Sequence, residues 1–393
     1  MVKFQYVVLS VIYIGLIVSI TYFLITGINK TPEVAQSYIQ PGQAEKLEIS
    51  ARQETAAKLN KELFLEGAAE NKTNSLPNAE PKFYPAPKYY VNYTKGLIFN
   101  PRFDFNIATD IAAAKKLGAN IIVIELELEA VRYNEPSIYT TQGYEDWKPR
   151  TIQIINEAHK QGMHVELRTV TRAATDMRVG PHTDNETSYF ANQTVQLFKQ
   201  LASFAQEYQA YKFTTYAEVN NLYNWGNRPD SDVNTILSRI VGAVRHEYSG
   251  KIGVGLTSAV FVDVQTNYNL GDYNYLLLSV YPDDIPDAQS YHKFGAYSNR
   301  IYETLKIAKL QAGQHGVKEL VIGSFGVNTD SSAPVPFKTT VSQQAEADMY
   351  DNIFNTHSNN TQGYTVAYDT FMYSVKGKPA EHVVGTWFRS LPN

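Results

Sequence analysis

Short apolar runs alternate with amphipathic stretches over the last three quarters of the chain. Eight such runs occur, at 96–100, 120–129, 163–170, 212–218, 251–256, 275–281, 319–325 and 364–369. Residues with apolar positions at helical spacing lie between most of them, at 104–117, 151–161, 188–208, 233–248, 300–312 and 343–354. Buried parallel strands appear in a sequence as short apolar runs and are joined by amphipathic helices. The pattern therefore predicts an α/β fold of eight βα units, the expectation for a (β/α)8 TIM barrel.

An open, doubly wound sheet is the main alternative, because it is also built from alternating strands and helices. Sheets of that type that bind dinucleotides carry a glycine-rich turn after the first strand. No such turn follows the first predicted strand at 96–100. We therefore expect the closed barrel, with any chemistry at the carboxyl-terminal ends of its strands.

The N-terminus carries a long apolar segment without a charged residue, from Phe4 to Ile28. As a helix it would be about 37 Å long, which exceeds the roughly 30 Å hydrocarbon core of a bilayer. A cleavable signal peptide has a shorter apolar stretch that ends at small residues, whereas this segment ends in Thr26-Gly-Ile-Asn29. We therefore predict an uncleaved signal-anchor helix at residues 1–29.

The orientation of this anchor is predicted from charges and from glycosylation motifs. Lys3 precedes the apolar segment, while Lys30 is followed by Glu33, so the positive-inside rule favours a cytoplasmic N-terminus only weakly. Asn-X-Thr motifs, which are used outside the cytoplasm, begin at Asn71, Asn92, Asn185, Asn192 and Asn359. The sequence thus predicts a single-pass membrane glycoprotein whose C-terminal domain is extracytoplasmic.

Residues 30–89 form a predicted stem and linker. The stretch 42–68 is rich in helix formers with apolar residues at helical spacing, and 71–87 contains four prolines that favour an extended spacer. The stem helix is either a solvated spacer or a self-association helix. The predicted barrel domain follows at 90–393.

Composition narrows the function. Charged residues are 19% of the chain and the net charge is −4. The sequence therefore gives no sign of a basic surface, and we do not expect the protein to bind nucleic acid. The chain has no cysteine, which excludes disulfides, thiolate catalysis and cysteine-bound zinc. No P-loop, HExxH or GxGxxG motif occurs and the eight histidines lack metal-ligand spacing, so we expect neither cofactor nor metal. The 28 tyrosines suit sugar-binding surfaces, but also any wet interface.

Glu218 is the most informative candidate for chemistry. It follows the apolar run Phe213 to Ala217 and precedes a loop that contains Asn220 and Trp225. Partial burial against aromatic rings raises the pKa of a carboxyl group, as a general acid requires. The alternative is an exposed glutamate that accepts hydrogen bonds from loop N–H groups.

The domain from about residue 95 resembles the clan A glycoside hydrolases, retaining (β/α)8 enzymes that include β-mannanases and endo-glucanases. The resemblance implies that Glu218, at the end of strand 4, is the acid/base. Ile322-Gly-Ser-Phe-Gly326 matches the family's strand-7 sequence Ile-Gly-Glu-Phe-Gly, with Ser324 at the position of the nucleophile. Tyr281 matches the tyrosine that often ends strand 6 near that nucleophile.

Two positions depart from the family pattern. Ala217 stands where an asparagine usually precedes the acid/base and contacts the substrate's 2-hydroxyl. Ser324 replaces a carboxylate, although retention needs two carboxyl groups about 5–5.5 Å apart. Standard double displacement is therefore not expected at this site.

Other carboxylates could replace the missing one. Glu125, Glu127 and Glu129 share one face of strand 2, and Glu166 and Arg168 share one face of strand 3. Glu129 and Arg168 either line the site or form a buried ion pair between adjacent strands. Inversion by activated water needs a wider carboxyl separation of about 6.5–9.5 Å. Candidates for that role lie near the ends of strands 6 and 8, at Asp283, Asp284 and Asp369.

Tryptophans could contribute to substrate binding. Trp147 and Trp225 fall in predicted mouth loops, where they either stack on sugar faces or simply pack. Three hypotheses follow. The protein is a membrane-tethered glycoside hydrolase that acts on surface or extracellular polysaccharide, a catalytically degenerate barrel that binds glycan, or a structural protein of the cell surface.

Overall fold

The computed structural model describes residues 83–130, 139–140, 142–173, 184–215, 230–257, 268–280, 294–327, 342–370 and 373–393. The chain divides into two units, Met1–Glu80 and Pro81–Asn393, and the described residues belong to the second. The predicted anchor and stem helix lie outside them. None of the helices within the described residues combines the length and the apolar character needed to cross a membrane.

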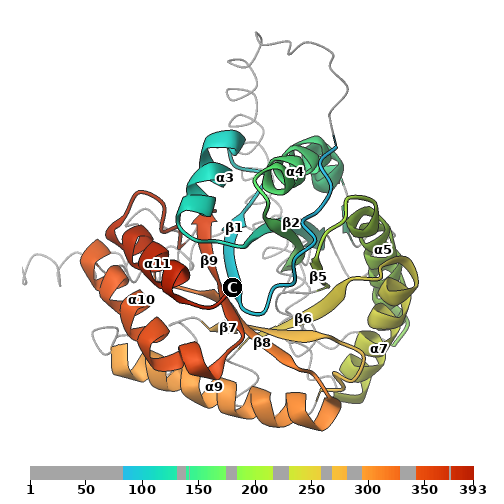
Figure 1. Cartoon of the computed structure of the whole chain (residues 1–393). Coiled ribbons are helices and arrows are strands. Elements are labelled where there is room, and N and C mark those ends of the chain that lie inside the picture. The colour runs from blue at the N-terminus through green and yellow to red at the C-terminus, as the bar shows by residue number, and fades with distance from the viewer. Residues whose placement is uncertain are drawn as a thin grey trace, which may run out of the picture. The chain divides into compact units, whose positions relative to one another are not determined.

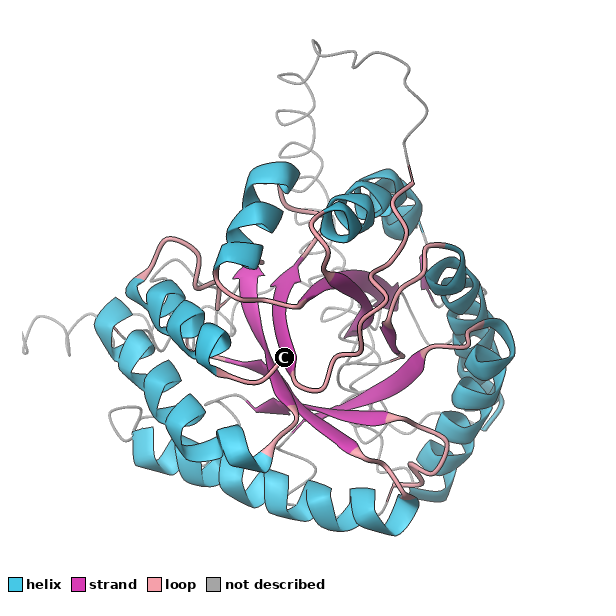
Figure 2. Ribbon diagram, viewed as in Figure 1, coloured by secondary structure: helices cyan, strands magenta, loops and turns pink. Residues whose placement is uncertain are grey.

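Parallel strands close into a barrel, as Figures 1 and 2 show. Within the described residues the barrel has eight strands, each hydrogen-bonded to its neighbours, and the pairing of β1 with β2 completes the ring. The predicted TIM barrel is thereby confirmed. The strands are β1 (Thr94–Phe99), β2 (Ile121–Ala130), β4 (His164–Ala173), β5 (Lys212–Thr214), β6 (Lys251–Thr257), β7 (Tyr275–Val280), β8 (Glu319–Phe325) and β9 (Gly363–Asp369).

Helices surround the sheet on its outer side (Figure 2). Six of them match predicted helices, although α4 begins well before the predicted start at Thr151 and contains Pro149. The short strand β3 (Tyr139–Thr140), antiparallel to β2, and the last helix were not predicted. The helices are α3 (Ile107–Lys116), α4 (Gln142–Lys160), α5 (Asp184–Glu207), α7 (Asp230–Glu247), α9 (Phe294–His315), α10 (Gln343–His357), the 3-10 turn η5 (Ser358–Asn360) and α11 (Pro379–Ser390).

Alternation along each strand sends one set of side chains to the helices and the other into the barrel. On β1, Leu97 and Phe99 join the main core, where the ring of Phe99 lies 5.3 Å from that of Phe105. Ile98 faces the opposite way and belongs to a separate buried cluster with Ile121 and Val123. The barrel interior therefore has its own small apolar core near the amino-terminal ends of the strands.

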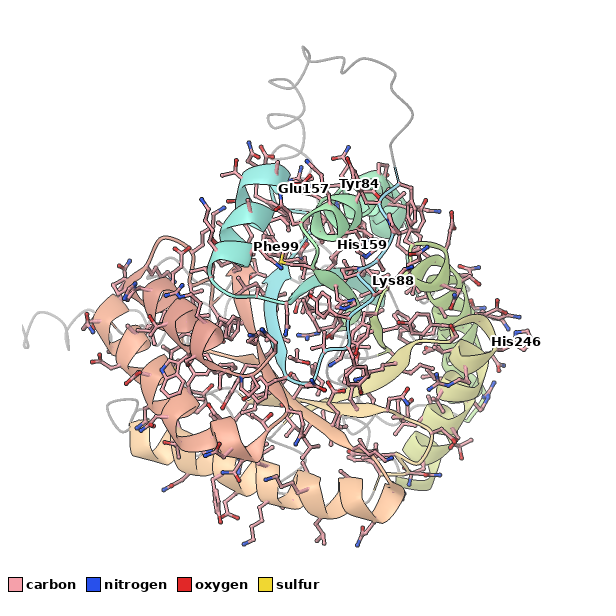
Figure 3. All side chains as sticks on the ribbon, viewed as in Figure 1. Tyr84, Lys88, Phe99, Glu157, His159 and His246 are labelled. Carbon is pink, nitrogen blue, oxygen red and sulfur yellow. The ribbon has the colours of Figure 1, made fainter. Side chains whose placement is uncertain are left out.

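The chain enters the barrel across its amino-terminal face. The hydroxyl of Tyr89 donates to the carbonyl of Gly162 at 3.2 Å, and the Tyr89 carbonyl lies 2.9 Å from Nε2 of His164. Figure 3 shows His159 next to Tyr84, whose carbonyl lies 3.1 Å from Nδ1 of the histidine. The segment 83–93, called the entry strap below, is thus fastened to two of the loops that lead from a helix into a strand.

Burial keeps the histidines under the entry strap neutral. The side chain of His159 is only 5% exposed, and this desolvation lowers its pKa to about 4. The pKa of His164 is lowered for the same reason. A neutral imidazole that donates from Nδ1 to the Tyr84 carbonyl fits this environment, because Nε2 of His159 has no hydrogen-bond partner within the described residues.

Candidate functional site

The mouth of the barrel lies at the carboxyl-terminal ends of its strands, where chemistry is placed in TIM barrels. The predicted residues Glu218, Asn220, Trp225 and Tyr281 lie outside the described residues, as do Asp283 and Asp284. The backbone of Glu129 is described and pairs with Arg172 of β4, but its side chain is not. The described residues therefore define the floor of the mouth and parts of its rim.

The interior of the barrel beneath the mouth is polar. Nε and Nη2 of Arg168 donate to Oε1 of Glu166 at 3.0 and 2.9 Å. The hydroxyl of Thr214 donates to the same oxygen at 2.8 Å and lies 2.7 Å from the hydroxyl of Tyr275. Branched aliphatic side chains usually fill this layer of a TIM barrel. The network therefore replaces ordinary packing with directed hydrogen bonds.

Arg168 lies within this layer and not at the mouth. Its side chain has no exposed surface, and its ion-pair partner is Glu166 of the same strand. This matches the expectation that Glu166 and Arg168 share one face of strand 3. Because the guanidinium is fully buried, Arg168 cannot contact a ligand unless the floor rearranges.

The guanidinium of Arg168 also reaches across the barrel to β8 and β9. Nη1 donates to the carbonyl of Gly323 at 2.7 Å, and Nη2 donates to the hydroxyl of Thr365 at 3.0 Å. The Thr365 hydroxyl in turn donates to the same Gly323 carbonyl. Gly323 directly precedes Ser324, so this contact ends one residue before that serine.

A bulge at Gly323 sets the direction of the next side chain. The register of β7 and β8 runs from Leu278 opposite Ile322 to Ser279 opposite Ser324, so Gly323 is an extra residue. A side chain at Gly323 would overlap with that of Leu277. Ser324 consequently lies beside Ser279, partly exposed, while the preceding and following residues of β8 are buried.

A second polar cluster lies at the rim between β1, β2 and α4. Glu127 accepts a hydrogen bond from Nδ2 of Asn100 at 2.8 Å and pairs with Nη1 of Arg102 at 3.2 Å. The Arg102 guanidinium lies 5.9 Å from the ring centre of Trp147, which belongs to helix α4 and not to a loop. Sequence reasoning singled out Glu129 on this strand. Glu127 was named with Glu125 and Glu129 as one face of strand 2, and the Asn100 that follows β1 could have indicated that Glu127 belongs to the rim.

The carboxylate of Asp369 is held outside the barrel interior, beside α3. Nζ of Lys376 lies 2.7 Å from Asp369 and 2.9 Å from Asp110, which belongs to α3. Burial raises the pKa of Asp369, against the opposing effect of the Lys376 ammonium. This ion cluster joins the end of β9 to its neighbours, and sequence alone gave no indication of Lys376 as a partner.

A buried carboxyl group that sequence reasoning missed lies behind β8. Glu346, in the first turn of α10, has no exposed surface, and burial raises its pKa to about 7 although Lys378 opposes the shift. The Lys378 ammonium is 3.6 Å away. One turn later, the hydroxyl of Tyr350 donates to the carbonyl of Phe325 at 3.2 Å. Nothing in the local pattern distinguishes Glu346 from a surface glutamate.

Within the described residues, no three histidine, aspartate or glutamate side chains are grouped so that they could hold a metal ion. The polar groups of the floor and rim are instead arranged for hydrogen bonding. They form a floor of buried donors and acceptors, a rim with one arginine and one tryptophan, and a serine at the end of β8.

Comparison with solved structures finds the same barrel in glycoside hydrolases. A GH113 β-1,4-mannanase matches with a TM-score of 0.58 and 15% identity, over 77% of this chain and 100% of that chain. The GH113 β-mannanase of Alicyclobacillus acidocaldarius, solved in complex with ManMIm, matches with a TM-score of 0.56 and 15% identity, over 77% and 98%. An exo-β-1,4-mannosidase of Opitutaceae bacterium strain TAV5 gives 0.50 and 11%, over 79% and 62%.

No protein-family model and no curated protein matches the sequence. The likeness to the solved structures is one of fold, and it confirms the (β/α)8 barrel that the sequence pattern predicted.

Proposed function

We propose that the domain binds an extracytoplasmic polysaccharide in the mouth of the barrel and cleaves it, with Glu218 as the general acid. The observation that carries this proposal is the placement of Ser324, partly exposed at the end of β8, in a barrel of the type that glycoside hydrolases use. Serine does not supply the carboxylate that a retaining enzyme needs. A water molecule therefore attacks the anomeric carbon directly, gives its proton to a second carboxylate, Asp283 or Asp284, and the product is inverted, while Glu218 protonates the leaving oxygen.

Hydrolysis is tested with the full chain in detergent and a panel of polysaccharides that begins with β-1,4-mannan, because solved structures of this fold include β-1,4-mannanases. We expect release of reducing ends that falls at least about 100-fold in Glu218→Gln. Glu207→Gln, an exposed position at the end of α5, is the matched control and should keep full activity. Proton NMR of the first product should show the inverted anomer. Absence of release from every polymer would rule out hydrolysis.

Glycan binding without cleavage is the second candidate, and the absence of a carboxylate at residue 324 favours it. Affinity electrophoresis with the same polymers measures binding independently of turnover. If the wild type binds a polymer that it does not cleave, and Ser324→Glu gains retaining hydrolysis, the barrel is a degenerate hydrolase that kept its binding site. If no polymer is bound, both candidates fail and a structural role at the cell surface remains.

The proposal places the domain outside the cytoplasm, tethered by the apolar segment Phe4–Ile28. Four of the glycosylation motifs lie within the described residues. Exposure, which attachment of a glycan requires, is found for the asparagines of three of them: Asn92, Asn192 and Asn359. Synthesis of the full chain with microsomes should give a ladder of glycosylated forms that endoglycosidase removes. Asn359→Gln should remove one step. A membrane-inserted product without any glycan would contradict this orientation.

A further inference from the structure

The end of β8 is held by side chains from four other elements. Three backbone groups of residues 323–326 bind side chains: the carbonyls of Gly323 and Phe325 and the N–H of Gly326. Because these contacts surround residue 324 on both sides, its backbone position is fixed from four directions. The side chains come from four elements: Arg168 (β4), Thr365 (β9), Tyr350 (α10) and Tyr297 (α9).

The contact from inside the barrel comes from a charged side chain, which stability alone does not explain. Burying the guanidinium of Arg168 costs free energy, and a buried ion pair can often be replaced by apolar residues without loss of stability. The Glu166 partner is also incompletely satisfied, because its Oε2 has no hydrogen-bond partner within the described residues. An aliphatic side chain has no donor, whereas Arg168 donates to the carbonyl of Gly323 on the far side of the barrel.

The bulge decides which way residue 324 faces. Leu320 and Ile322 belong to the core beneath the helices, and strict alternation would send residue 324 to that side as well. The extra residue Gly323 reverses the alternation, so that Phe325 joins the core and Ser324 does not. A hydrogen bond to the carbonyl of the extra residue therefore acts on the backbone feature that turns Ser324 away from the core beneath the helices.

We propose that Arg168 is a positioning residue, which together with Thr365 stabilises the Gly323 bulge and so presents the Ser324 hydroxyl to the bound glycan. This inference rests on the proposed function for the identity of the ligand. The Ser324 hydroxyl is then a ligand contact that donates to or accepts from a sugar hydroxyl. Arg168 never touches the ligand.

Because the chain has no cysteine, Ser324→Cys in the full chain gives a single thiol that can carry a trifluoromethyl label. We expect one sharp fluorine resonance. Thr365→Val, which keeps the shape of the side chain and removes its hydroxyl, should broaden or split this resonance, and Arg168→Lys should do so more strongly. The same label on Leu310→Cys, an exposed position of α9, should not respond to either substitution. An unchanged resonance at residue 324 in a folded Thr365→Val protein overturns the proposal.

Glycan affinity is measured with Ser324 intact. Thr365→Val should weaken binding about five- to tenfold, as expected for one misplaced hydrogen bond, with little change in the thermal midpoint. Ser324→Ala should weaken it by a similar factor, and the two substitutions together should do no more than either alone. Additive losses would overturn the proposal. If no glycan binds the wild type, the proposed function fails, whereas the fluorine spectra still decide whether Arg168 and Thr365 position residue 324.

Discussion

Nη1 of Arg168 lies 2.7 Å from the carbonyl oxygen of Gly323, a residue 155 positions later in the sequence. The hydrogen bond joins two strands on opposite sides of the barrel, and the Arg168 side chain that spans the interior has no exposed surface. A barrel that needed only to be stable would fill this space with aliphatic side chains. The effect of this contact on the stability of the barrel can therefore be measured by substitution of Arg168.

Removing the charge of Arg168 should strongly destabilise the barrel. Arg168→Met leaves Glu166 buried and unpaired, and we expect a loss of about 3–5 kcal/mol in the free energy of unfolding, measured with urea. Arg168→Met combined with Glu166→Leu should recover most of it, because an apolar pair of similar volume has no charge to bury. Arg245→Met, at an exposed arginine of α7, should cost under about 1 kcal/mol. A double variant no more stable than the single one would contradict this account.

Acid should loosen the entry strap through His159. Its folded pKa of about 4 lies below the unfolded value of 6.5, so the unfolded chain takes up a proton first as the pH falls. Stability is therefore unaffected above about pH 6.5 and declines as the pH falls toward 4, by about 2–3 kcal/mol. Thermal unfolding at pH 7 and pH 4.5 measures the loss. His159→Gln should reduce it, whereas His246→Gln, at the exposed position labelled in Figure 3, should not.

Glu346 predicts the opposite pH dependence. Its folded pKa of about 7 lies above the unfolded value of 4.5, so the folded protein holds the proton more tightly. The stability associated with it is present below about pH 4.5 and is lost as the pH rises through 7. Glu346→Gln should stabilise the protein at pH 8 by about 1–3 kcal/mol and have little effect at pH 5. Urea unfolding at both values tests this, with Glu303→Gln, a half-exposed position of α9, as the control. Equal effects at both values would show that the carboxyl group is ionised throughout.

The rim cluster should affect ligand binding more than stability. Arg102 is 31% exposed, so Arg102→Ala should cost at most about 1 kcal/mol of folding free energy. If the rim contacts glycan, however, the same substitution should weaken binding about tenfold, because a charged donor beside Trp147 is lost. Lys306→Ala, far more exposed on α9, is the control. Calorimetric titration with a polysaccharide that the wild type binds measures the effect. Unchanged affinity in Arg102→Ala would show that the rim cluster does not contact the glycan.

The eight strands could be predicted because parallel barrel strands are buried on both faces and appear as apolar runs. The start of α4 could not, because Pro149, Gly143 and Asp146 have low helix propensity, which tertiary packing overrides. Helix α11 was missed because it follows the last βα pattern. Alternation placed Glu166 and Arg168 on one face correctly, but alternation carries no information on depth. Whether Arg168 lies at the mouth or in the floor depends on which strands meet across the barrel.

Carboxylates at strand ends illustrate the same limit. Asp369 ends β9 as predicted, yet Lys376 draws its side chain toward Asp110. A loop a few residues long decides this, through an ion pair that any nearby lysine could have formed. Ser324, by contrast, could be located from its motif, because the glycines around it mark the bulge as well as the chemistry.

The entry strap also has a consequence for how the barrel can be used. Residues 83–93 cross the amino-terminal pole, and Phe83 ends against α5, with its ring 6.0 Å from that of Tyr208. Phe83 therefore lies at the pole opposite to the mouth of the barrel. The entry strap thus contacts the barrel only on the face opposite to its mouth within the described residues. A force applied to the chain at Phe83 would act first on the contacts of the entry strap with His159 and His164. The mouth would stay accessible to a polymer.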